Sequence, residues 1–163
     1  TVQFRLRPTS VNAYRKGFYY FFIPEDVNND GVISPQEGRT LADWAQEIVA
    51  TCQNEDLNFN GILDPNEDFN SSGTLTPGNV ASVNRSAATD GSGVALARVT
   101  YAKDYASWAS VTLQAAIQVA GTEYTQSVDF VLPGLAADYD DTAVSPPGLH
   151  SPFGVSANCS DSR

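Results

Sequence analysis

Two twelve-residue segments carry oxygen-bearing side chains at the spacing that a calcium loop requires. Such a loop uses oxygens at positions 1, 3, 5 and 9, a main-chain carbonyl at 7, a bidentate Glu at 12 and Gly at 6. Residues 26–37 and 56–67 fill all of these positions, so we expect each loop to bind one Ca²⁺ ion. The predicted ligands of the first loop are Asp26, Asn28, Asp30, Val32, Ser34 and Glu37. Those of the second loop are Asp56, Asn58, Asn60, Ile62, Asp64 and Glu67.

A third copy of the pattern, residues 68–79, follows the second directly. Its position 12 is Asn79, which cannot supply a bidentate carboxylate. Two interpretations stay open: the segment binds a third ion, or it only imitates the shape of its neighbour through local hydrogen bonds of Asx and Ser side chains. Its candidate ligands are Asp68, Asn70, Ser72, Thr74 and Thr76.

Composition excludes several classes of partner. The chain has 163 residues, a formal net charge of −10 and 42% hydrophobic residues, which suits one domain with a real core. An acidic surface disfavours nucleic acid and anionic membranes, both of which need basic side chains. No apolar run approaches the roughly 20 residues that span a bilayer, so we expect no membrane insertion. Because the chain has no Met and no leader pattern, we expect a mature or excised part of a longer protein.

The two cysteines, Cys52 and Cys159, lie far apart in the sequence. Together with the calcium loops they favour one disulfide and an oxidising, extracellular location. The alternative is a pair of unrelated buried thiols, because spacing alone does not prove pairing.

Alternating polar and apolar residues predict several short strands. Candidate strands cover residues 1–7, 11–23, 94–101 and 109–119, and Ala120-Gly121 turns the chain into a partner strand that ends near Leu132. This pattern is typical of an all-β fold, an antiparallel β-sandwich.

One short helix is expected between the first two calcium loops. Thr40 and Asp43 resemble a capping box, and the apolar residues that follow repeat at helical spacing up to Cys52. We therefore expect a single domain, 1–163, with a calcium-binding insertion at 24–79. Residues 133–163 are rich in Pro and Gly and predict an irregular tail.

Part of the second half resembles bacterial Ig-like domains of the invasin and intimin type. The resemblance lies in Thr89, Asp90, Gly93 and Ala95, then in Val99-Thr100, the strand Val111 to Ala115 and the closing Val128-Asp129-Phe130. It covers about 45 residues, departs from the family in the calcium loops, and implies an Ig-like spacer or adhesive module of a surface or secreted protein. The loops themselves are similar to those of dockerins and EF-hand proteins, without the compact helical pair of a dockerin.

No catalytic constellation is evident in the sequence. The only histidine, His150, stands in the irregular tail, and the acids Asp138, Asp140 and Asp141 suit a solvated loop better than an acid pair or a further calcium site. We therefore expect no enzyme but a calcium-stabilised structural or adhesive module that adjoins other domains of a surface protein. The alternative is a module that binds a glycan or a protein in a calcium-dependent way.

Overall fold

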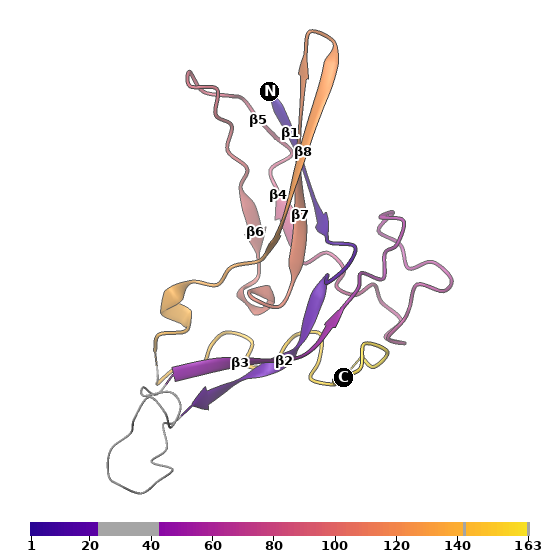
Figure 1. The fold of residues 1–163 in the computed structure, drawn as a ribbon, viewed down its shortest axis with the longest axis vertical. Coiled ribbons are helices and arrows are strands. Elements are labelled where there is room, and N and C mark those ends of the chain that lie inside the picture. Colours follow the sequence, from indigo (N-terminus) through magenta and orange to yellow (C-terminus); the bar gives the residue numbers. More distant parts are fainter. Residues whose placement is uncertain (23–42, 142, 163) are drawn as a thin grey trace, which may run out of the picture.

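The chain folds into antiparallel strands, as the alternating patterns predict (Figure 1). The computed structural model describes residues 1–22, 43–141 and 143–162. Within these ranges the helical elements are the 3₁₀ turns η2 (Lys103–Tyr105) and η3 (Ala136–Asp138), and none is long and apolar enough to cross a membrane. The strands are β1 (Val2–Pro8), β2 (Tyr14–Phe22), β3 (Asp43–Cys52), β4 (Ala81–Val83), β5 (Ser86–Ala87), β6 (Val99–Tyr101), β7 (Ser110–Val119) and β8 (Thr122–Val131).

The largest sheet has four strands in the order β5-β1-β7-β8. In β1, exposed and half-buried residues alternate, which confirms the predicted half-buried strand. Ala120 and Gly121 both have positive φ and join β7 to β8, so the predicted hairpin is also confirmed. This hairpin forms the long arm at the top of Figure 1.

Two smaller sheets complete a sandwich-like, all-β fold. β4 pairs with β6 and contacts β1, and β2 pairs with β3. In Figure 1, β4 and β6 lie beside the long sheet, whereas β2 and β3 lie across its lower end.

The expected helix before Cys52 is wrong, because residues 43–52 form strand β3. The register of β2 against β3 shifts between Lys16 and Gly17, where a bulge interrupts the ladder. A bulge reverses which residues face the core, so the buried Ala45 and Cys52 of β3 are seven positions apart. An interval of seven residues also matches two helical turns, although Ile48 between these two residues is 44% exposed.

The hydrophobic core lies where β2, β3, the beginning of β7 and the tail meet. Trp108, Ala109 and Leu132 are completely buried at its centre, and Tyr19 packs edge-on against Trp108 with ring centroids 5.2 Å apart. Burial raises the pKa of the Tyr19 hydroxyl well above its ordinary value. The aromatic stripe of the second strand thus contributes to the core, as expected.

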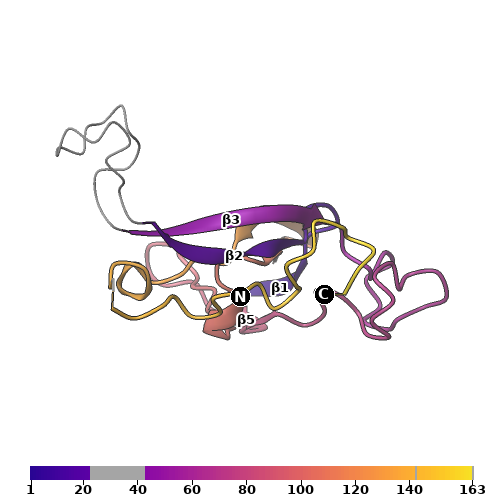
Figure 2. The same ribbon diagram turned by 90° about the horizontal axis from the view of Figure 1, so that it is seen from below.

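The irregular tail packs along the free edge of β2. The N–H of Tyr19 donates to the carbonyl of Leu149 at 2.7 Å, and the N–H of Ser151 donates to the carbonyl of Gly17 at 2.8 Å. Cys52 and Cys159 form the predicted disulfide, with Cα atoms 5.6 Å apart. Seen from below in Figure 2, the tail lies against the β2–β3 pair and ends close to it. A bond of this kind is typical of an oxidising environment.

A substitution at Gly17 tests the bulge. Gly17 has φ +150°, and a Cβ there would lie 1.9 Å from the carbonyl oxygen of Glu47. Gly17→Ala should therefore lower the free energy of unfolding by at least about 1–3 kcal/mol, the usual range for a strained backbone position. Gly91→Ala is the matched control, because a Cβ at Gly91 meets nothing within 4 Å. Equal denaturant midpoints for the two variants would refute the bulge.

Removal of the disulfide tests the anchoring of the tail. The bond joins residues 107 positions apart, for which the chain-entropy model gives about 4–5 kcal/mol. A variant with both Cys52→Ala and Cys159→Ala should lose a large part of that free energy in guanidinium unfolding. Its residues beyond 150 should also become open to protease, and unchanged cleavage would contradict the proposed anchoring.

Candidate calcium site

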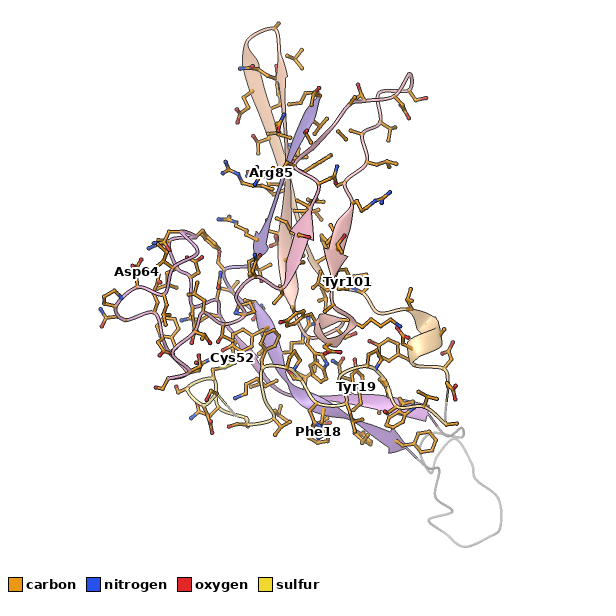
Figure 3. All side chains as sticks on the ribbon, turned by 180° about the vertical axis from the view of Figure 1, so that it is seen from behind. Phe18, Tyr19, Cys52, Asp64, Arg85 and Tyr101 are labelled. Atoms are coloured by element: carbon orange, nitrogen blue, oxygen red, sulfur yellow. A yellow bond between two sulfur atoms is a disulfide. The ribbon has the colours of Figure 1, made fainter. Side chains whose placement is uncertain are left out.

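The segment between Cys52 and Val80 contains the second and third predicted loops and no strand. Cys52 and Val80 are both buried in the core, so the segment leaves the core and returns to it. Figure 3 shows Asp64 out on the projecting loops and Cys52 near their base. The six predicted ligands of the first loop, residues 26–37, lie outside the described residues.

Asp56, at position 1 of the second loop, is fixed by main-chain donors. Its Oδ1 accepts a hydrogen bond from the N–H of Asn60 at 3.0 Å, and its Oδ2 accepts one from the N–H of Gly61 at 2.9 Å. Gly61 has φ +77°, the left-handed conformation that position 6 requires. The carboxylate therefore faces the inside of the loop.

Three further predicted ligands converge on one point. The Nδ2 atoms of Asn58 and Asn60 both donate to Oδ2 of Asp64, each at 2.8 Å. The Oδ1 atoms of the same two amides accept hydrogen bonds from the N–H groups of Asn60 and Ile62 at 2.9 and 2.7 Å. All three side chains are thus held by hydrogen bonds within the loop.

Glu67, at position 12, closes the loop from within. Its side chain is buried at 5% exposure, and its Oε1 and Oε2 accept hydrogen bonds from the N–H groups of Leu57 and Asp64, both at 3.0 Å. Its own N–H donates to the carbonyl of Asp64 at 3.1 Å. Both ends of the loop are thus tied to a single carboxylate.

The donor set of the second loop fits calcium. In the part of the chain that the structure describes, no three Asp, Glu, His or Cys side chains form a metal-holding group by themselves. A cation here would therefore use the carboxylates together with amide and main-chain carbonyl oxygens. Calcium accepts such mixed oxygen sets with six to eight ligands.

The third loop repeats this geometry closely. Oδ1 and Oδ2 of Asp68 accept hydrogen bonds from the N–H groups of Ser72 and Gly73 at 2.9 and 3.0 Å. Nδ2 of Asn70 donates to Oγ1 of Thr76 at 2.8 Å, just as Asn58 donates to Asp64 in the second loop.

The backbone of the two loops agrees as well. Position 4 has φ 59° at Phe59 and 56° at Ser71, and position 6 has φ 77° at Gly61 and 74° at Gly73. The third loop therefore has the shape that the sequence predicts.

Glu55, which the sequence analysis did not select, lies inside the third loop. Its side chain is completely buried, and it accepts hydrogen bonds from the N–H groups of Asn70 at 3.0 Å and Thr76 at 2.8 Å. Burial raises the pKa of the Glu55 carboxyl; the two N–H donors lower it, and the nearby charge of Asp68 raises it further. One signal was available: the pair Glu55-Asp56 recurs twelve residues later as Glu67-Asp68.

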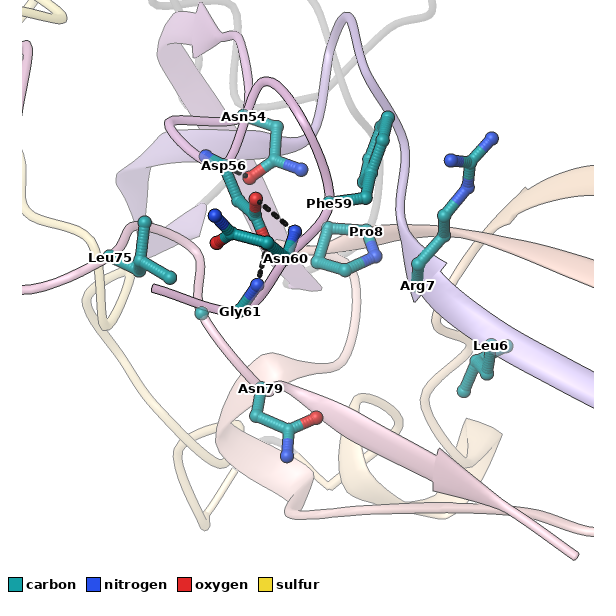
Figure 4. A pocket seen from close by; sticks show the side chains of 11 residues that line it. Leu6, Arg7, Pro8, Asn54, Asp56, Phe59, Asn60, Gly61, Leu75 and Asn79 are labelled. Carbon is teal, nitrogen blue, oxygen red and sulfur yellow. Dashed lines mark hydrogen bonds between the residues drawn. The ribbon is translucent and has the colours of Figure 1, made fainter. Parts of the chain in front are cut away.

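A pocket of about 320 Å³ separates the second loop from β1 (Figure 4). Phe59 is the one aromatic residue that lines it. The guanidinium carbon of Arg7 lies over the Phe59 ring, 3.8 Å from the ring centroid. Asn54 is 2% exposed; its Oδ1 accepts a hydrogen bond from the N–H of Asp56 at 3.1 Å, and its Nδ2 has no hydrogen-bond partner among the described residues. The pocket is lined by Leu6, Arg7, Pro8, Asn54, Asp56, Phe59, Asn60, Gly61, Leu75, Gly78 and Asn79.

The other titratable candidates lie apart from the calcium loops. His150 is exposed and pairs through its main chain with Phe18 on the edge of β2. Asp138 forms an ion pair with Lys103 at 2.8 Å, and Oδ1 of Asp141 accepts a hydrogen bond from the N–H of Ala143. These contacts give both acids ordinary structural partners.

No protein-family model, no curated protein and no solved structure matches the chain. The geometry of the loops is therefore the basis for any statement about function.

Proposed function

We propose that the chain is a calcium-stabilised structural module of a secreted or cell-surface bacterial protein, without catalytic activity. The observation that carries this proposal is the second loop, in which Asp56 and Glu67 are held by main-chain donors around the converging side chains of Asn58, Asn60 and Asp64. The loop 26–37 has the same complete set of ligand types in its sequence. Calcium is the cation that this chemistry favours.

The position of the loops suggests what calcium does. The loop segment starts at the disulfide-bonded Cys52 and returns to the core at Val80. Ions that fix this segment would also hold β3 and the tail, and would give a unit that resists unfolding. The resemblance of residues 89–130 to bacterial Ig-like domains agrees with a spacer or adhesive role, and the disulfide agrees with an extracellular location.

A second candidate function is calcium-dependent binding of a glycan or a protein. The pocket beside the second loop favours it, and so does the amide nitrogen of Asn54, which has no hydrogen-bond partner in the part of the chain that the structure describes. The covered ring of Phe59 argues against it, because glycan sites usually present an open aromatic face. A binding screen of the calcium-loaded and calcium-free forms, with Asn54→Ala as the comparison, separates the two candidates.

Calorimetry of Glu67→Gln tests the proposed function. The native chain should bind Ca²⁺ in the range of about 10⁻⁴–10⁻³ M that is typical of extracellular modules, and much less Mg²⁺. Glu67→Gln removes the bidentate carboxylate and should bind one ion fewer. Glu123→Gln, an exposed position on β8, is the matched control and should keep the native number.

Thermal unfolding gives a second readout of the same site. Calcium at about 100 times its dissociation constant adds roughly 2.7 kcal/mol per site, so excess chelator should lower the melting temperature of the native chain. The loss should be smaller in Glu67→Gln. An identical melting curve with calcium and with chelator would contradict the proposal.

A further inference from the structure

We propose that Glu55 closes the loop 68–79 into a further calcium site, in the role that Asn79 cannot fill. The inference rests on the proposed function of the neighbouring loop 56–67, and extends it to a site whose closing ligand stands outside the twelve-residue pattern. The candidate ion would lie among Asp68, Asn70, Ser72 and the carboxylate of Glu55.

Glu67 and Glu55 each contact the residue at position 9 of a loop, Asp64 in the second loop and Thr76 in the third, and the two sets of contacts match. Oε2 of Glu67 accepts from the N–H of Asp64 at 3.0 Å, and the N–H of Glu67 donates to the carbonyl of Asp64 at 3.1 Å. Oε2 of Glu55 accepts from the N–H of Thr76 at 2.8 Å, and the N–H of Glu55 donates to the carbonyl of Thr76 at 3.0 Å. Glu55 therefore makes the same two hydrogen bonds with position 9 of the third loop that Glu67 makes with position 9 of the second loop.

The remaining oxygens of the third loop gather in the same space. Oγ of Ser72 donates to the carbonyl of Thr74 at 2.8 Å, and Oγ1 of Thr76 lies 3.4 Å from the same carbonyl. Asn70, which is 5% exposed, reaches Oγ1 of Thr76 with its Nδ2. Oδ1 of Asn70 and Oδ1 of Asp68 both accept a hydrogen bond from the N–H of Ser72 at 2.9 Å. The loop thus offers carboxylate, amide, hydroxyl and carbonyl oxygens, a mixed set that suits Ca²⁺.

The complete burial of Glu55 is the second observation behind the proposal. Its carboxylate has no exposed surface, and its two oxygens accept hydrogen bonds from neutral main-chain N–H groups of Asn70 and Thr76. Two neutral N–H donors satisfy hydrogen bonds but do not cancel a buried negative charge. A divalent cation between Glu55 and Asp68 would cancel it.

The two sites would then differ in where the closing carboxylate stands. Glu67 is position 12 of the second loop itself, whereas Glu55 lies just before the second loop and reaches across to the third. The third loop would therefore depend on the segment that leads into the second.

Ion counting by mass spectrometry under native conditions tests this assignment. Glu55→Gln should bind one Ca²⁺ ion fewer than the native chain, and so should Asp68→Asn. The double variant Glu55→Gln/Asp68→Asn should also lose one ion, because both residues belong to one site. Glu55→Gln/Glu67→Gln should lose two. Asn79→Ala is the matched control at position 12 and should lose none.

Each outcome has one meaning. A native ion count in Glu55→Gln or in Asp68→Asn, or a loss in Asn79→Ala, would overturn the assignment. A loss of two ions in Glu55→Gln/Asp68→Asn would place the two residues in different sites and would also overturn it. If Glu55→Gln does not fold, Glu55→Asp takes its place: it keeps the charge but shortens the side chain, and should also cost one ion, whereas a native count would overturn the assignment. An unchanged count in Glu67→Gln would instead refute the proposed function of the second loop.

Discussion

The buried carboxylate of Glu55 is the constraint on which the loop segment depends. It accepts main-chain hydrogen bonds from Asn70 and Thr76, and so ties the third loop to the root of the second. A carboxylate with no exposed surface is costly unless its charge is compensated. The calcium proposal supplies that compensation, and it explains why an acidic chain places a glutamate inside its own loops.

The loop segment is connected to the core at both ends. The N–H of Asn54 donates to the carbonyl of Ser10 at 3.1 Å, and the N–H of Ala13 donates to the carbonyl of Cys52 at 2.8 Å. At its other end the chain re-enters the core at Val80 and continues into β4. The loop segment therefore adjoins β3 at one end and β4 at the other, and the disulfide joins its first end to the tail.

The sequence predicted correctly those strands in which polar and apolar residues alternate without interruption. The alternation in residues 1–7 and 109–119 gave strands, because side chains of a half-buried strand face opposite sides in turn. The helix before Cys52 was predicted wrongly, because the bulge opposite Gly17 changes the alternation in the middle of β3. A shift of one residue cannot be seen without the partner strand.

In the candidate site, too, the residues with local contacts were predicted and those with distant contacts were not. The ligands inside each twelve-residue loop follow from spacing alone, because the loop chemistry is local. Glu55 lies outside the twelve-residue pattern and its two hydrogen bonds reach residues 15 and 21 positions away, so its one marker in the sequence is the repeat of Glu55-Asp56 as Glu67-Asp68. The disulfide was predicted from the presence of two cysteines, whereas the main-chain bonds of the tail to β2 have no marker in the sequence.

The most direct test of the account is a crystal structure of the native chain grown with calcium, with anomalous difference density measured for that element. The account predicts two separate peaks between residues 54 and 79, one contacted by Asp56 and Glu67 and the other by Asp68 and Glu55. Crystals with millimolar calcium and no anomalous peak in either loop would contradict it.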